Sequence, residues 1–165
     1  MMIRRMVEVM LTAAVLGVVA AVAVWFQEPF LAPSLGSAVF TQLLHPEEAS
    51  AKPYAILVGQ ILGAASGFAG VFLAGAASQP SFMGAHPLVW TRVVAITVTA
   101  ILAASLQLIS GAMTPAGGAT ALVVSIGAEA DAPSGAMHLA VGLVLVTIMG
   151  EAARRAVLGL RSRKT

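Results

Sequence analysis

Two Pro-Gly segments are the part of this sequence whose residues could do chemistry. Residues 33–36 read Pro-Ser-Leu-Gly, and residues 115–118 read Pro-Ala-Gly-Gly. Proline suits the first turn of a helix, because the N–H group that it lacks would have no partner inside the helix there. Glycine lets a backbone or a ligand come close. The pattern therefore predicts two helix N-termini that are open to close approach.

A helix that starts inside a membrane needs a polar partner. Up to four N–H groups at its start lack acceptors within the helix, and hydrocarbon offers none. Water, hydroxyl groups or a bound anion would satisfy them, and the helix dipole favours the anion. We therefore predict a small-anion site lined by residues of both segments: Ser34, Gly36, Ser37, Thr114, Gly117, Gly118 and Thr120. The alternative is that both segments are short interfacial helices that only connect spans.

The composition indicates that lipid surrounds most of the chain. Of its 165 residues, 59% are hydrophobic and 10% are charged, whereas a soluble domain has about 25% charged residues. The mean hydropathy is +0.94. The basic residues gather toward the two ends of the chain and form no stripe interleaved with aromatic residues, which argues against a nucleic-acid partner. Cysteine is absent, which removes disulfides and thiolate chemistry.

Four apolar stretches are long enough to cross about 30 Å of hydrocarbon. They cover roughly residues 6–26, 54–77, 89–112 and 136–153. The Pro-Gly segments, roughly residues 33–44 and 115–128, are too short to span the membrane, and they predict re-entrant or half-helices. We therefore expect an all-α membrane protein with four transmembrane helices, in a single transmembrane domain over residues 1–165.

The basic residues predict the orientation, because positive charges mark the cytoplasmic side. In a four-span arrangement one side carries Arg4, Arg5, Arg92, Arg154, Arg155, Arg161, Arg163 and Lys164. The loops predicted on the other side carry Glu28, Glu47, Glu48, Lys52, Glu129 and Asp131 and are acidic on balance. We expect a multi-pass protein of the bacterial inner membrane, with both termini in the cytoplasm and residues 154–165 as a basic cytoplasmic tail.

Two carboxylates, Glu8 and Glu151, fall near the predicted cytoplasmic ends of the first and fourth spans. Pairing with a cation lowers the cost of holding a charge at the membrane boundary. We expect these carboxylates to pair with Arg4, Arg92 or Arg154.

The chain also has the pattern of an internal duplication. When residues 33–40 are laid over residues 115–122, the proline and a glycine coincide. Each copy lies between two predicted spans, so repeat 1 covers about residues 6–77 and repeat 2 about residues 89–153. If each unit holds two crossings, both copies point the same way. The prediction is a parallel two-fold repeat about the membrane normal.

Small and polar residues inside the spans predict helix contacts. Gly59, Gly63 and Gly67 recur every four residues, which predicts a close helix–helix contact. Gln60 and Gln107 lie well inside spans two and three, where an amide needs a partner helix or a wet cavity. Four spans enclose little volume, which favours a homo-oligomer.

The same residues resemble the HPP family of four-span integral membrane proteins. Residues 32–39, Ala-Pro-Ser-Leu-Gly-Ser-Ala-Val, are similar to that family's Ala-Pro-x-Gly-Ala-Ser segment. Residues 114–122, Thr-Pro-Ala-Gly-Gly-Ala-Thr-Ala-Leu, resemble its His-Pro-Pro-Gly-Gly-Ala-Thr-Ala-Leu signature, with Thr-Pro-Ala in place of His-Pro-Pro. Plant plastid and cyanobacterial members are implicated in nitrite transport, so the resemblance implies transport of a small anion.

Two functions remain open. The first is a transporter or channel for a small, nitrite-like anion that binds at the half-helix N-termini. The second is a non-transporting scaffold or sensor subunit in which the Pro-Gly segments only close the fold. The sequence has no metal-ligand spacing, nucleophile triad, phosphate loop or dinucleotide fingerprint, so we expect neither an enzyme nor a cofactor or metal. The expected partners are the lipid bilayer, the anion and other copies of the chain.

Overall fold

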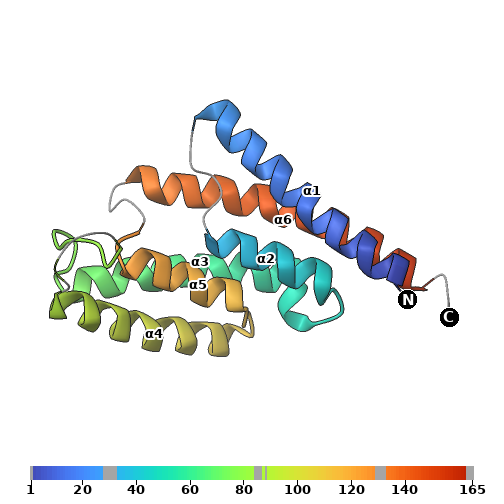
Figure 1. The fold of residues 1–165 in the computed structure, drawn as a ribbon. Coiled ribbons are helices and arrows are strands. Elements are labelled where there is room, and N and C mark those ends of the chain that lie inside the picture. The colour runs from blue at the N-terminus through green and yellow to red at the C-terminus, as the bar shows by residue number, and fades with distance from the viewer. Residues whose placement is uncertain (1, 28–32, 84–86, 88, 129–132, 163–165) are drawn as a thin grey trace.

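The computed structural model describes residues 2–27, 33–83, 87, 89–128 and 133–162, and these residues are helical without strands. Four helices are long and apolar enough to cross a membrane: α1 (Met2–Phe26), α3 (Pro53–Leu73), α4 (Trp90–Ser110) and α6 (Pro133–Ser162). Two shorter apolar helices are α2 (Pro33–Leu44) and α5 (Pro115–Ser125), and a 3₁₀ turn, η1 (Ala49–Ala51), precedes α3. Figure 1 shows the arrangement. The predicted all-α fold with four spans is confirmed.

Proline and glycine set several helix boundaries. Pro53 and Pro115 occupy the first turns of α3 and α5, each after an extended residue. At this position proline costs no helical hydrogen bond. Gly111 ends α4 with a φ of 67°, a left-handed conformation that glycine adopts without strain. These local signals make α5 a separate short helix after α4.

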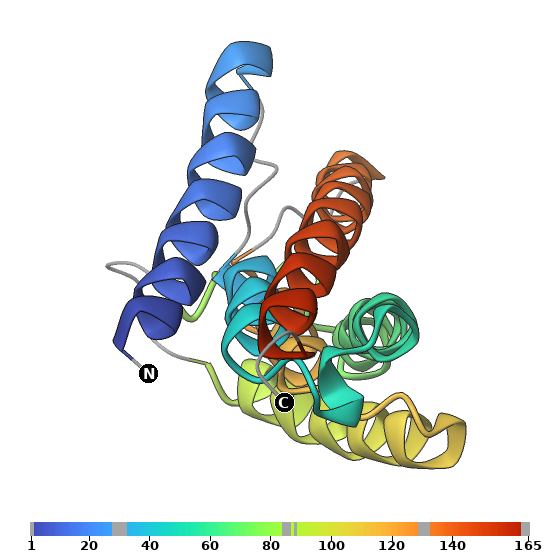
Figure 2. The same cartoon turned by 90° about the vertical axis from the view of Figure 1, so that its right-hand side faces the viewer.

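The helices form two groups of three. In one group α1, α2 and α6 contact each other, and in the other α3, α4 and α5 contact each other. The groups meet mainly where α2 packs on α5 and α3 packs on α6. Figure 2 shows α1 and α6 on one side of the bundle and α4 on the other, with α2, α3 and α5 between them.

Contacts along the helices give their directions in the first group. Glu8, near the start of α1, accepts a hydrogen bond from Arg161, near the end of α6, so these helices are antiparallel. Leu35 shares a cavity with Leu139, and the carbonyl of Pro46, just after α2, accepts a hydrogen bond from Arg154 of α6. Therefore α2 and α6 run the same way.

Contacts along the helices also give their directions in the second group. Residues 63–67 of α3 lie beside residues 117–124 of α5 in the same order, so these two helices are parallel. The hydroxyl of Tyr54, at the start of α3, donates to the carbonyl of Ser110, at the end of α4, at 3.0 Å, so α4 is antiparallel to α3. Successive helices from α1 to α6 thus alternate in direction (Figure 1).

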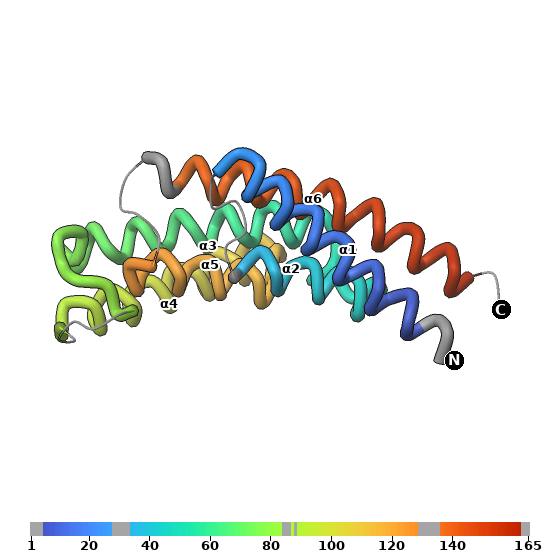
Figure 3. Tube along the Cα trace, turned by 45° about the horizontal axis from the view of Figure 1, so that its top comes forward, coloured from blue at the N-terminus to red at the C-terminus, as the bar shows by residue number. Residues whose placement is uncertain are grey.

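Both ends of the described chain lie at one end of the bundle (Figure 3). There Arg161 bonds Glu8 at 2.9 Å and Glu47 at 3.1 Å, which brings the loop of residues 45–52 to the same place. We call this the terminal end, and the other the opposite end. Trp25 and Trp90 lie at the opposite end with exposed side chains, as expected for indoles in the headgroup layer.

The predicted path of the chain through the membrane is wrong in three respects. The loop with Glu47, Glu48 and Lys52 lies at the terminal end, and Arg92 lies at the opposite end, the reverse of the prediction. The physical reason is that the short helices are not re-entrant: each carries the chain from one end toward the other, so α3 and α4 run opposite to the predicted directions. The predicted loop residues Glu28, Glu129 and Asp131, and the tail residues Arg163 and Lys164, lie outside the described residues.

The third correction concerns the repeat. The unit α1–α3 begins at the terminal end, and the unit α4–α6 begins at the opposite end. Two units related by an axis along the membrane normal would start from the same end. The directions of the helices therefore do not fit the predicted parallel repeat.

Candidate binding site at the half-helices

The contact of α3 with α5 positions α5 in the bundle. A methyl group at Gly63 would overlap the carbonyl oxygen of Gly117 and lie 2.9 Å from its carbonyl carbon. At Gly67 it would lie 2.6 Å from the Cβ of Val124. At Gly59 it would lie 2.6 Å from the carbonyl oxygen of residue 112. The stripe of Gly59, Gly63 and Gly67 therefore lies where the two backbones come closest.

The start of α5 is capped inside the protein. The side-chain oxygen of Gln107 accepts the N–H of Thr114 at 3.0 Å, so Gln107 has a partner helix as expected. The N–H groups of Gly117 and Gly118 both bond to the carbonyl of Thr114, at 3.1 and 3.3 Å. A methyl group at Gly117 would overlap the carbonyl of Gly59. Gly117 thus serves helix packing and is not open to a ligand.

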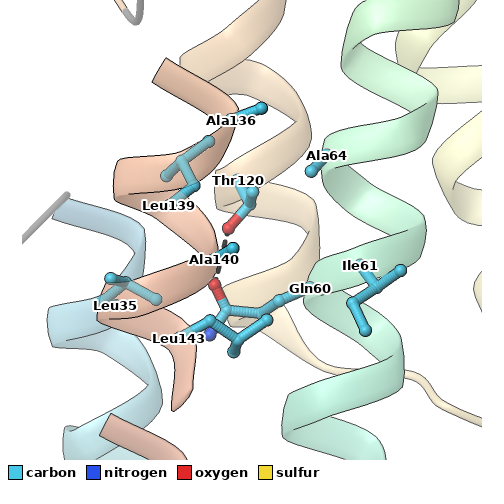
Figure 4. A pocket seen from close by; sticks show the side chains of 9 residues that line it. All are labelled: Leu35, Gln60, Ile61, Ala64, Thr120, Ala136, Leu139, Ala140 and Leu143. Atoms are coloured by element: carbon cyan, nitrogen blue, oxygen red, sulfur yellow. Dashed lines mark hydrogen bonds between the residues drawn. The ribbon is translucent and has the colours of Figure 1, made fainter. Parts of the chain in front are cut away.

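A cavity of about 140 Å³ lies between the two helix groups, and we call it the central cavity. All four helices that meet there contribute to its wall. Its lining residues are Leu35 of α2, Gln60, Ile61 and Ala64 of α3, Thr120 of α5, and Ala136, Leu139, Ala140 and Leu143 of α6 (Figure 4).

Gln60 brings polar atoms to this wall. Its side chain is 2% exposed, and its amide oxygen accepts the hydroxyl of Thr120 at 2.7 Å. Its amide nitrogen has no hydrogen-bond partner among the described residues. Figure 4 shows the side chain reaching from α3 toward α6, with the nitrogen beside Leu143. A buried donor without a partner costs about 1–3 kcal/mol, so this nitrogen is a strong candidate for a ligand contact.

The first turn of α2 lies beside the same cavity through Leu35. Ser34 is 1% exposed, and its hydroxyl has no partner among the described residues. The hydroxyl of Ser37 instead donates to the carbonyl of Ser34 at 2.7 Å. A methyl group at Gly36 would meet nothing within 4 Å. The N–H groups of this turn lack acceptors within the helix, so they add donors near the cavity.

The seven predicted site residues do not line one common cavity. Thr120 lines the central cavity, which Ser34, Gly36 and Ser37 flank in the first two turns of α2. Thr114 and Gly118 line a separate, open groove of about 600 Å³ between α4 and α5. The N-terminus of α5 therefore lines this groove, whereas the N-terminus of α2 lies at the central cavity. The hydroxyl of Thr114 is buried and has no partner among the described residues.

Comparison with known proteins decides the family. The family described as HPP, transmembrane region, matches residues 1–160. The chain belongs to the HPP transmembrane family. The match covers nearly the whole chain and agrees with the resemblance of the two Pro-Gly segments. No curated protein and no solved structure matches the chain.

In this HPP protein the charged side chains gather at the two ends of the bundle. At the terminal end Glu151 accepts hydrogen bonds from Arg154 at 3.1 Å and Arg155 at 2.7 Å. Glu8 pairs with Arg161, an arginine outside the predicted set, because α6 continues to residue 162, well past the predicted end of the fourth span. The predicted pairing of Glu151 with Arg154 is present, and the side chain of Arg4 lies outside the described residues. Among the residues that the structure describes, no three His, Asp or Glu side chains are grouped to hold a metal ion.

Arg92 caps α5 from the opposite end. It is 2% exposed, and its guanidinium donates to the carbonyls of Gln79 at 2.6 Å, Pro80 at 3.1 Å and Ser125 at 3.4 Å. A cation near the last carbonyls of a helix complements the helix dipole. Arg92 of this HPP protein is thus a buried structural residue and not a marker of the cytoplasmic boundary.

Sequence analysis missed two parts of the cavity wall. Gln60 was recognised as a buried amide in need of a partner, but it was not assigned to the site. Ala136, Leu139, Ala140 and Leu143 of α6 are apolar residues in an apolar span, so no sequence signal marks them. The amide of Gln60 was the available clue, because a glutamine inside a span has to meet another polar group.

Proposed function

We propose that this HPP protein transports a small anion of the size of nitrite, which binds in the central cavity at the start of α2. The observation that carries the proposal is the amide nitrogen of Gln60, buried and without a partner among the described residues, next to the N-terminus of a half-helix. The amide of Gln60 and the start of α2 thus lie at the same cavity.

Electrostatics favours an anion in this position. A helix N-terminus carries about half an elementary positive charge, and its free N–H groups point at the ligand. The lining residues include no acidic side chain that would repel an anion. They also include no Lys or Arg, and this suits transport, because a substrate has to leave as readily as it enters.

The size of the cavity favours a substrate of a few atoms. One water molecule takes about 30 Å³ in the liquid. A volume of about 140 Å³ therefore accommodates a triatomic anion with a little hydration.

An inverted relation between α1–α3 and α4–α6, which we infer from the glycine spacing and the helix directions, would support transport over a static role. Gly59 and Gly67 of α3 are eight residues apart, as are Gly142 and Gly150 of α6. Gly67 lies against α5, and Gly150 lies against Gln42 of α2. With the two proline-started half-helices, this suggests that α1–α3 and α4–α6 are equivalent units of opposite direction. In many transporters such units place the substrate site at half-helices near their interface.

The same proposal orients the protein. Arg5, Arg154, Arg155 and Arg161 lie at the terminal end, whereas Arg92 at the other end is buried and bonded to backbone carbonyls. Positive charge marks the cytoplasmic side. We therefore place the terminal end, with both termini, in the cytoplasm of a bacterium whose inner membrane holds the protein.

A non-transporting scaffold is the second candidate, and the close contact of α3 with α5 favours it. Backbones held together by Gly63 and Gly117 make a rigid unit. This contact, however, lies inside one helix group, whereas the central cavity lies between the groups. A rigid α3–α5 pair is therefore compatible with transport.

Uptake of nitrite into proteoliposomes tests the proposal. We expect Gln60→Leu to lower uptake by about tenfold, the equivalent of one good hydrogen bond to the anion. Its fold should persist, because Thr120 keeps a bond to the carbonyl of Ala116 at 3.1 Å. The control is Gln79→Leu, which makes the same chemical change outside the cavity and leaves the backbone carbonyl that Arg92 uses.

Two outcomes would count against transport through this cavity. If Gln60→Leu takes up and binds nitrite like the wild type, the cavity is not the site. If folded wild-type protein moves no small anion from a panel of nitrite, nitrate, formate and chloride, the scaffold role takes precedence.

A further inference from the structure

A second buried polar group lies between α2 and α6. Gln42 is 0% exposed, and both its amide oxygen and its amide nitrogen have no partner among the described residues. A methyl group at Gly150 would overlap that amide oxygen and lie 2.8 Å from its Cδ. The glycine of α6 therefore makes room for an amide whose polar atoms are unused.

A third polar atom lies on the same face of α6. Thr147 precedes Gly150 by three residues, and residues at this spacing share a helix face. The hydroxyl of Thr147 is also buried and also has no partner among the described residues. Buried polar atoms in native folds nearly always have a hydrogen-bond partner, and a bound water or ion would provide one here. Together Gln42 and Thr147 offer two kinds of donor and an acceptor.

These residues lie between the central cavity and the terminal end. Along α6, Leu143 lines the cavity, Thr147 follows one turn later, and Arg154 lies beyond at the terminal end. Along α2, Leu35 lines the cavity and Gln42 follows two turns later. Both helices run the same way, so their polar residues lie in the same order.

We propose that Gln42 and Thr147 form a second anion-binding site, through which the transported anion and its water pass between the central cavity and the terminal end. This site rests on the proposed function, and it names the route on one side of the membrane. Its ligand is a small inorganic anion of the nitrite type, held by the Gln42 N–H₂ group and the Thr147 hydroxyl.

The position of Gln42 predicts weak binding there. It lies in the last turn of α2, where the helix dipole is negative, whereas the central cavity lies at the positive end of the same helix. The anion is therefore held more firmly in the central cavity and is passed on at Gln42. At the terminal end of this route Arg154 bonds the carbonyl of Pro46 at 2.7 Å and the carboxylate of Glu151 at 3.1 Å, and Arg155 bonds the same carboxylate at 2.7 Å, so the guanidinium groups there outnumber the carboxylate.

Cysteine accessibility tests whether water and anions reach the site. The chain has no cysteine, so a single thiol at Thr147→Cys reports on its position alone. A thiol reacts as the thiolate, which forms only where water has access. With a small anionic thiosulfonate added at the terminal end, we expect Thr147→Cys to react at least about tenfold faster than Val146→Cys, and saturating nitrite to slow the reaction. Val146 is a matched control, because it is the preceding residue and is packed in the apolar core.

A near-isosteric substitution tests the contribution of the amide. We expect Gln42→Met to lower nitrite uptake by about tenfold, while nitrite binding in the central cavity is unchanged. Thermal stability should be equal or higher, because an apolar side chain of similar size replaces unpaired polar atoms. Thr41→Val is the control on α2, since that hydroxyl bonds only the carbonyl of Ser37 in the same helix, at 2.9 Å.

The possible results separate the two proposals. Equal labelling of Thr147→Cys and Val146→Cys would overturn the second site. If Gln42→Met loses both uptake and thermal stability, the second site would also be overturned, because Gln42 would then have a structural role. Normal uptake by Gln42→Met beside impaired uptake by Gln60→Leu would overturn the second site and leave the central cavity in place. Normal uptake by both variants would overturn the proposed function as well.

Discussion

A single methyl group added at Gly63 should weaken the whole fold. In Gly63→Ala the new carbon would overlap the carbonyl oxygen of Gly117 and lie 2.9 Å from its carbonyl carbon and 3.3 Å from its Cα. All three are backbone atoms of α5, so no side-chain rotation makes room. Overpacking of this kind costs about 1–3 kcal/mol, while alanine in place of glycine in a helix stabilises by about 0.5–1 kcal/mol. From the middle of both ranges the net destabilisation is about 1 kcal/mol, which corresponds to a melting temperature about 2–4 °C lower for a chain of this size.

Thermal unfolding in mild detergent, followed by circular dichroism, measures this difference. Two glycines provide matched controls, because a methyl group at Gly17 of α1 or at Gly118 of α5 would meet nothing within 4 Å. We expect Gly17→Ala and Gly118→Ala to melt at or slightly above the wild-type temperature. If Gly63→Ala melts with these controls, the backbones of α3 and α5 are not in contact at this point and the reasoning fails.

Two further predictions follow from the corrected path of the chain. Arg92→Gln should lower the melting temperature more than Arg155→Gln. The reason is that hydrogen bonds from the charged Arg92 to the carbonyls of Gln79, Pro80 and Ser125 are worth about 1.5–3 kcal/mol each. Equal melting temperatures of the two variants would contradict the capping role. Ala49 is an exposed position in η1, and an impermeant reagent should label Ala49→Cys from the side that carries the C-terminus. The same reagent should label Ala77→Cys from the other side. The reverse pattern would restore the loop positions predicted from the sequence.

The positions of the helices followed from sequence because they depend on local signals. Hydropathy marks the four spans, and proline at positions 33, 53 and 115 marks three helix starts. The directions could not be predicted in the same way. Whether a helix of eleven or twelve residues returns to its own side or completes a crossing depends on what it packs against. That is a tertiary property, and here α3 and α6 provide the packing surfaces.

The charge count placed Arg92 at the wrong end for a related physical reason. The positive-inside rule treats each arginine as exposed at a boundary. Arg92 is instead buried and donates hydrogen bonds to backbone carbonyls, so its position does not indicate the cytoplasmic side of the membrane. At the central cavity, the type of Thr120 made it a predicted lining residue, but its hydrogen bond with Gln60 could not be predicted. That pairing requires the register that Gly63 and Gly117 impose on α3 and α5.

The strengths of the contacts indicate which part of the bundle would move in the proposed transport. Arg161 ties α6 to Glu8 and Glu47 within the first group, and the glycine contacts tie α3 to α5 within the second. Across the central cavity the facing side chains are largely apolar, such as Leu139 from one group and Ala64 from the other. Apolar contacts carry no directional bonds that resist sliding, whereas separating either group internally would break charged pairs or expose packed backbone. The least costly way to open the cavity is therefore a movement of one group against the other, with the proposed anion site in the surface between them.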